Sequence, residues 1–221
     1  MKKIVTSLCI LLMAGAISFS ASAKGGIIFK GGLSYSNLNL NEKFTEQYKE
    51  FTGGEGYKNF TGWHFGVGFQ SGTAAGFSVQ PELLYNAKGS VLGDKLSWNL
   101  KYLELPINIQ WGPDLVAFRP YIMASPFLGY CISNKLKVNK DNPPIDKFPE
   151  LNNLFKDANK LEYGVGVGIG FDISRIQIAL KYNWNFGTVA DIENIKSVGE
   201  NIKGITKTAA NSLEISLGLK F

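Results

Sequence analysis

The sequence is poor in the residues that build catalytic and metal sites, because it has one histidine, His64, and two cysteines, Cys9 and Cys131. Cys9 lies in the apolar segment at the amino-terminus. A chain that loses this segment keeps one cysteine and cannot form an intramolecular disulfide. One histidine and one cysteine do not supply the spaced ligands of a metal site. We therefore expect no metal and no cofactor.

Long apolar runs are also missing after the amino-terminus. No segment beyond residue 23 reaches the roughly 18 consecutive apolar residues typical of a membrane-spanning helix. Lipid offers no hydrogen bonds to the backbone, so only helices and closed barrels span it. If the mature chain enters a membrane, it must do so as a closed β-barrel.

The amino-terminus has the features of a secretory signal peptide. Lys2 and Lys3 precede the apolar segment 4–19, and the small residues Ala21-Ser22-Ala23 follow it. We expect cleavage after Ala23, which makes 1–23 the signal peptide and 24–221 the mature domain. A retained anchor helix is the alternative.

Charge of either sign is modest. The chain has 23 basic and 18 acidic residues, and loss of Lys2 and Lys3 leaves 21 against 18, a net charge of +3. This charge is too small and too dispersed to indicate a nucleic-acid partner.

What the sequence does contain is alternation of apolar and polar residues, which is typical of strands with one apolar face. The last segment is an example, because Leu213, Ile215, Leu217, Leu219 and Phe221 alternate with polar or small residues. A strand that ends on an aromatic residue resembles the closing strand of an outer-membrane barrel, and Phe221 is our candidate assembly signal for the barrel assembly machinery. We predict eight strands, at 26–38, 61–70, 76–89, 98–111, 117–131, 161–172, 175–186 and 210–221.

The predicted connections alternate in length along the chain. Short ones fall at 71–75, 112–116 and 173–174, and long ones at 39–59, 90–97, 132–160 and 187–209. Outer-membrane barrels have short periplasmic turns and long extracellular loops. The sequence therefore predicts an all-β, eight-stranded antiparallel up-and-down transmembrane barrel with four long extracellular loops.

Side-chain size indicates which face is outside. Segment 161–172 alternates bulky apolar residues, such as Val165 and Ile169, with Gly164, Gly166, Gly168 and Gly170. Eight strands enclose too little space for so many bulky side chains, so we expect the apolar set to face lipid. A soluble lipocalin-like carrier would need the opposite placement. The segment 117–131, with Pro120 and Pro126, has a weak pattern, and its faces stay unassigned.

Two motifs carry a family resemblance. Pro81-Glu-Leu-Leu-Tyr-Asn-Ala-Lys-Gly89 is followed by Tyr102-Leu-Glu-Leu-Pro106. This pair resembles the signature of the PorT-like outer-membrane β-barrel family of Bacteroidetes. The resemblance implies a barrel in the outer membrane, and some members of that family are linked to secretion and gliding machinery.

Charged residues share the polar face of several predicted strands. A narrow lumen cannot hold isolated ions at low cost, so we expect them to pair, with Glu82 and Glu104 matched by lysines or Arg119. The predicted lumen charge network is Lys30, Glu82, Lys88, Glu104, Arg119, Glu162, Lys181 and Glu214. It either fills the lumen as a structural plug or forms a proton or ion path.

Two further features suggest chemistry only weakly. The glycines 164–170 do not have the spacing of a nucleotide-binding loop, and we expect them to make room for long lumen side chains. His64 has lumen parity, with Ser78 or Gln80 as candidate neighbours on the next strand. A hydrogen-bonded lumen histidine fits better than a catalytic one.

The long loops are the candidate binding regions. The last loop has apolar residues at helix-like spacing, namely Ile192, Ile195, Val198 and Ile202. This face either covers the barrel mouth or contacts an envelope protein.

We therefore predict a non-enzymatic outer-membrane protein with a plugged lumen, surrounded by outer-membrane lipid. Its role is structural, or accessory to an envelope or secretion complex. A narrow channel for small solutes or ions and an outer-membrane lipid-modifying enzyme are the alternatives.

Overall fold

The computed structural model describes residues 25–39, 57–92, 96–115, 117–138, 160–187 and 209–221. The predicted signal peptide and the candidate partner residues Ile192, Ile195, Val198 and Ile202 lie outside these ranges. Within the described ranges, no helix is long and apolar enough to cross a membrane.

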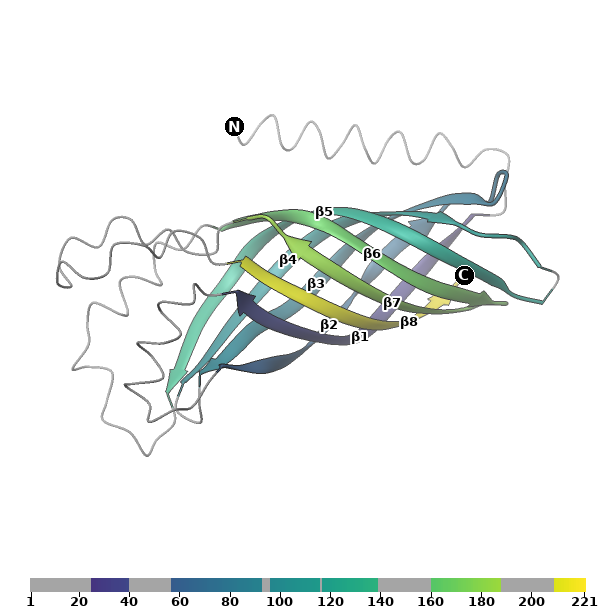
Figure 1. The fold of residues 1–221 in the computed structure, drawn as a ribbon. Coiled ribbons are helices and arrows are strands. Elements are labelled where there is room, and N and C mark those ends of the chain that lie inside the picture. Colours follow the sequence, from purple (N-terminus) through teal and green to yellow (C-terminus); the bar gives the residue numbers. More distant parts are fainter. Residues whose placement is uncertain (1–24, 40–56, 93–95, 116, 139–159, 188–208) are drawn as a thin grey trace.

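Eight antiparallel strands form one closed barrel, in which each strand pairs with its neighbours in sequence and β1 pairs with β8 (Figure 1). This confirms the predicted fold class. The strands are β1 (Gly26–Asn39), β2 (Tyr57–Gln70), β3 (Phe77–Leu92), β4 (Leu96–Trp111), β5 (Arg119–Val138), β6 (Leu161–Ile173), β7 (Ile176–Asn185) and β8 (Ala209–Lys220).

Several strands extend beyond their predicted limits. β3 and β4 pair as far as Leu92 and Leu96, so only 93–95 separates them, and the predicted long loop 90–97 is mostly strand. Trp98 accordingly lies within β4, where it pairs with Ser90 and Leu136. β5 reaches Val138 and shortens the predicted loop 132–160 in the same way. The strict alternation of short and long connections therefore fails between β3 and β4, since side-chain alternation does not mark where hydrogen bonding between strands ends.

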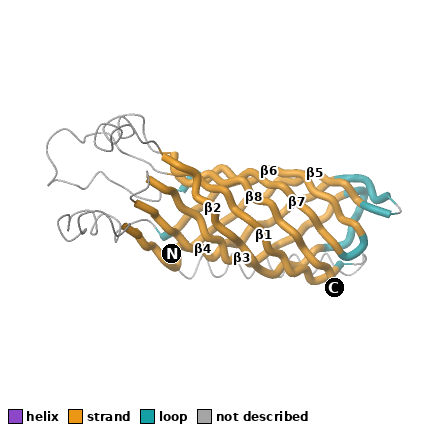
Figure 2. Tube along the Cα trace, turned by 90° about the horizontal axis from the view of Figure 1, so that it is seen from below, coloured by secondary structure: helices purple, strands orange, loops and turns teal. Residues whose placement is uncertain are grey.

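The barrel is elongated, and its strands are tilted around it (Figures 1 and 2). The β2–β3, β4–β5 and β6–β7 connections, described at 71–76, 112–115, 117–118 and 174–175, lie at one end of the barrel, which we call the turn end (Figure 1). The tight turns at this end contain three residues with positive φ, namely Ala75 (51°), Gly76 (81°) and Ser174 (54°). Short turns of outer-membrane barrels face the periplasm, so the opposite end is extracellular.

Apolar side chains cover the outside of the barrel, as the alternation predicts. Leu217 is 60% exposed and Ile122 is 58% exposed, whereas the residues directly before and after each of them in the strand are buried. In β7 the alternation is complete from Ile176 to Asn185. Such a surface suits lipid and is the reverse of a soluble carrier's.

β5, whose faces the sequence leaves open, also has a regular alternation. Ile122, Ala124 and Pro126 face outward, and Tyr121, Met123 and Phe127 are buried. The inward positions of β5 thus hold bulky apolar side chains, which is why its pattern is weak in the sequence.

Glycines of β6 accommodate these bulky residues, which confirms the expectation that they make room in the lumen. A Cβ atom on Gly170 would lie 2.3 Å from Tyr121, and one on Gly164 would lie 2.7 Å from Phe127. Real Cβ atoms do not approach other atoms so closely. The glycines of β6 therefore serve the packing of side chains inside the barrel.

Candidate functional site in the barrel lumen

Toward the extracellular end of the lumen, a group of buried side chains surrounds Lys88 of β3. Its Nζ lies 2.7 Å from Glu104 of β4 and 3.2 Å from Glu162 of β6. The same ammonium lies 5.6 Å from the ring centroid of Tyr102 and 5.1 Å from that of Phe127. One lysine therefore bridges two buried carboxylates, and aromatic faces cover the rest of it.

Amide side chains complete the coordination of these carboxylates. Asn185 donates to Glu162 at 2.6 Å, and Asn86 donates to Glu104 at 3.3 Å. Asn86 also donates to Glu214 at 2.8 Å, which links β3 to β8. Because amide and ammonium donors surround the carboxylates, the cost of burying them is reduced.

Two further ion pairs lie next along the lumen. Lys181 of β7 is 3.1 Å from Glu214 of β8, and Lys30 of β1 contacts Glu82 of β3. Gln80 also donates to Glu82. These contacts place Glu82 and Glu104 with lysines, whereas Arg119 pairs elsewhere.

His64 lies in this part of the lumen and is 2% exposed. Its Nε2 is 2.9 Å from Ser216 Oγ of β8, not beside Ser78 or Gln80 of the neighbouring β3. The ring crosses β1 at Gly32, where a Cβ atom would lie 2.8 Å from it. Because Gly32 has no side chain, the ring of His64 can pass over β1 and reach Ser216 of β8.

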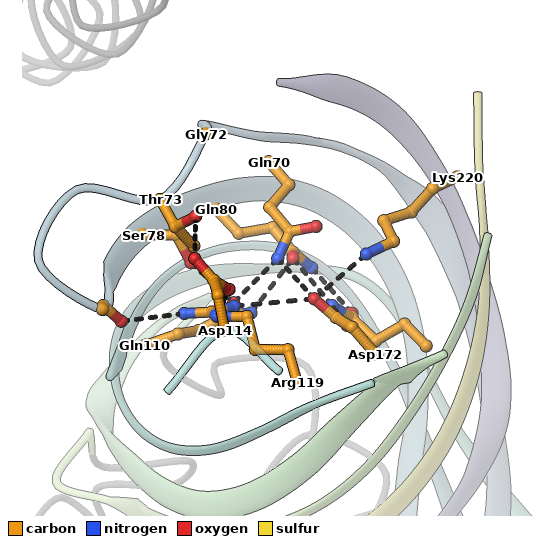
Figure 3. Close-up of polar contacts among 12 residues, drawn as sticks. Gln70, Gly72, Thr73, Ser78, Gln80, Gln110, Asp114, Arg119, Asp172 and Lys220 are labelled. Carbon is orange, nitrogen blue, oxygen red and sulfur yellow. Dashed lines mark hydrogen bonds and ion pairs between the residues drawn. The ribbon is translucent and has the colours of Figure 1, made fainter. Parts of the chain in front are cut away.

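The turn end of the lumen contains a polar layer centred on Asp172 of β6 (Figure 3). Lys220 Nζ lies 3.0 Å from Asp172, and Arg119 Nη1 lies 3.5 Å from it. Gln70 and Gln177 each donate to Asp172 at 3.0 Å. Four side chains from four strands therefore meet at one carboxylate.

Glutamines extend this layer across the lumen. Gln110 accepts from Gln70 at 2.9 Å and from Arg119 at 3.1 Å, and it donates to Gln80 at 3.0 Å. Gln80 in turn donates to Gln177 at 3.0 Å. Their amides both donate and accept, so they form a continuous network without added charge.

Arg119 also reaches the turn between β4 and β5. Its Nε is 3.2 Å from Asp114, which is 51% exposed, and Thr73 of the turn between β2 and β3 donates to the same carboxylate (Figure 3). Arg119 Nη2 donates to the backbone carbonyl of Gly76 at 3.1 Å. Arg119 therefore joins the lumen to two turns.

The network is larger than the sequence predicts. The structure brings each residue of the predicted network beside an opposite charge, and it joins to the network Asp172 and Lys220, which the alternation already places on the lumen face, together with the glutamine layer. Asp172 and Lys220 both have lumen parity in the sequence, which was the available signal. Within the described residues, no cluster of three metal-ligating side chains occurs.

Phe221 follows β8 at the turn end. Its backbone N–H donates to Ile27 at 2.8 Å, and its ring packs edge-on against Phe29 with 5.7 Å between centroids. The final residue is thus held against β1, where the barrel closes.

Comparison with known proteins agrees with the fold. Residues 20–191 match the family described as outer membrane protein beta-barrel domain. The chain belongs to this family and is an outer-membrane β-barrel protein. Among curated proteins, no match is found.

Several solved structures are similar to this chain. Neisserial surface protein A has 9% identity and a TM-score of 0.47, with 88% of this chain and 97% of that chain covered. Pseudomonas aeruginosa OprG has 16% identity and a TM-score of 0.46, with 90% and 97% covered. Escherichia coli outer membrane protein W has 14% identity and a TM-score of 0.43, with 90% and 100% covered.

Proposed function

We propose that this protein is a non-enzymatic outer-membrane barrel with a closed lumen, which serves as a structural or accessory part of an envelope or secretion complex. The observation that carries the proposal is charge matching in the lumen. Among the described lumen side chains, Lys30, Lys88, Arg119, Lys181 and Lys220 face Glu82, Glu104, Glu162, Asp172 and Glu214, five cations against five carboxylates.

Charge matching supports a plug more than a pore. An ion-selective pore needs side chains of one sign that are free to meet the permeating ion. Here each charged group lies within ion-pair distance of an opposite charge, and most are less than a tenth exposed. An ion entering this lumen would have to break buried ion pairs, and breaking such a pair is costly.

The surroundings of His64 support a role without catalysis. Ser216 is its hydrogen-bonding neighbour, but the buried Nδ1 has no partner among the described residues, so no third group orients the ring. The pair faces the filled lumen, away from the lipid surface where a lipid substrate would lie.

The proposal also covers the family group of the chain, its signal peptide and a surface for a partner protein. The motifs Pro81–Gly89 and Tyr102–Pro106 support membership of the PorT-like group. We further propose that a signal peptide is cleaved after Ala23.

The apolar residues of 192–202 are the proposed contact with an envelope protein. Deletion of 191–203 is expected to remove a copurifying partner, and unchanged copurification would reject this surface.

Conductance tests the closed lumen directly. The purified full-length protein in a planar lipid bilayer is expected to give no discrete current steps, whether unmodified or as Glu82→Gln. Steady steps from the unmodified protein would overturn the closed lumen. Bilayers that receive the same detergent without protein control for current steps caused by damage to the bilayer.

A further inference from the structure

Lys101 of β4 is a charged residue on a surface that is mostly apolar. It lies between the buried residues Leu100 and Tyr102, shares the outward parity of Leu103, and is partly exposed. Among the strand side chains that the structure describes, no other charged residue faces outward. A charge facing lipid is costly unless it reaches polar groups, so its depth decides its role.

Distance along β4 places Lys101 at the edge of the apolar band. Trp111 lies ten residues later, at the turn end of the same strand, and is 50% exposed. Ten residues of strand span about 33 Å, or about 25 Å along the barrel axis at a tilt near 40°. This equals the typical height of about 25 Å for the apolar band of an outer-membrane barrel. If Trp111 marks the periplasmic boundary, Lys101 marks the extracellular one.

Lys101 lies beside Tyr85 on the outer surface, and Tyr85 belongs to a cluster of three aromatic rings. Its Nζ is 5.8 Å from the ring centroid of Tyr85, which stacks on Trp63 and on Phe65, each with centroids 5.3 Å apart. Trp63 and Phe65 also stack on each other at 5.4 Å. We call Trp63, Phe65 and Tyr85 the aromatic platform. Within the platform, the ring of Tyr85 holds the ammonium through a cation–π contact.

The ammonium keeps hydrogen-bond donors that the platform does not use. Within the described part of the chain, no carboxylate lies within ion-pair distance of Lys101, whereas each lumen lysine has one. Lys101 is therefore a positive charge held at headgroup depth, next to rings that suit the start of an acyl chain. Its complement is a phosphate group attached to a lipid.

We infer that Lys101 and the aromatic platform form a binding site for the phosphate group of an anionic lipid in the outer leaflet. The lipid phosphate accepts from the Lys101 ammonium, and the upper acyl chain packs on Trp63 and Phe65. This site depends on the barrel and its membrane, not on the closed lumen, so it stands or falls separately from the proposed function.

Native mass spectrometry of the full-length protein in a non-ionic detergent tests the site, with phosphatidylglycerol as the anionic probe and phosphatidylcholine as the zwitterionic one. The unmodified protein is expected to retain phosphatidylglycerol in preference to phosphatidylcholine. Lys101→Gln is expected to weaken phosphatidylglycerol binding about fivefold. Lys101→Arg is expected to preserve it.

Lys160 supplies the matched control, because it is an exposed lysine just before β6 at the same end of the barrel. Lys160→Gln is expected to leave binding unchanged. Equal losses in Lys101→Gln and Lys160→Gln would show general surface charge and overturn the site, as would unchanged binding in Lys101→Gln. Tyr85→Leu is expected to reduce binding while Lys101 is intact, and no reduction would remove the platform from the site. Heat-modifiable migration of each variant verifies that the barrel has formed.

Discussion

Lys88 and Glu104 form a buried ion pair of 2.7 Å that joins the two sequence motifs, because Lys88 belongs to Pro81–Gly89 and Glu104 to Tyr102–Pro106. Tyr102 of the second motif adds its ring face to the same ammonium. The two motifs therefore supply the partners of one ion pair between β3 and β4. Glu162 of β6, on the other side of β5, binds the same ammonium.

Replacement of Lys88 by Met is expected to destabilise the barrel strongly. It leaves Glu104 and Glu162 buried without their cation, and loss of one partner from a buried pair costs about 3–5 kcal/mol. Urea unfolding of the barrel in phospholipid vesicles measures the change. The triple variant Lys88→Met, Glu104→Gln, Glu162→Gln removes the charges together and is expected to recover most of the loss. A Lys88→Met variant as stable as the unmodified protein would contradict the network.

The turn-end layer predicts a contrast between two aspartates that both pair with Arg119. Asp172 is 6% exposed and also binds Lys220, so Asp172→Asn is expected to cost about 3 kcal/mol. The side chain of Asp114 is 51% exposed, so Asp114→Asn is expected to cost at most about 1 kcal/mol. Unfolding of both variants under the same conditions checks the order, and equal losses would show that burial does not set the strength of this layer.

Parity along the strands allowed the outside of the barrel to be predicted, because a period of two determines which residues share a face. It could not identify lumen partners, since these depend on the stagger of strands around the barrel. His64 bonds Ser216 across β1, and Asn86 reaches Glu214 of β8, although neither pair lies on neighbouring strands. The faces of β5 were hidden for a related reason. Its inward Tyr121 and Phe127 fit only because glycines of β6 lie opposite.

This packing predicts a difference in stability between two glycine substitutions. Gly170→Ala places a methyl group 2.3 Å from Tyr121 and is expected to cost about 1–3 kcal/mol through overpacking. Gly31→Ala is the matched control, because its nearest contact would be 3.6 Å away and alanine restricts the unfolded chain. It is expected to be neutral or slightly stabilising. The double variant Gly170→Ala, Tyr121→Leu should regain part of the loss in the same unfolding assay. Equal stability of the two single variants would show that the lumen wall has room to spare.

The lipid-facing surface predicts a dependence on depth. Leu217 of β8 is 60% exposed and lies midway between Leu213, opposite Tyr35 near the extracellular end, and Phe221 at the turn end. Leu217→Lys puts an ammonium near the bilayer midplane and is expected to cost about 2–4 kcal/mol. Thr61 pairs with Tyr35 and is exposed near the extracellular boundary, so Thr61→Lys is expected to cost about 0–1 kcal/mol. Unfolding in vesicles measures both, and a large cost at Thr61 or none at Leu217 would place the membrane at a different height on the barrel. That result would also remove the depth assigned to Lys101, because its distance from the turn end is counted along the same barrel axis.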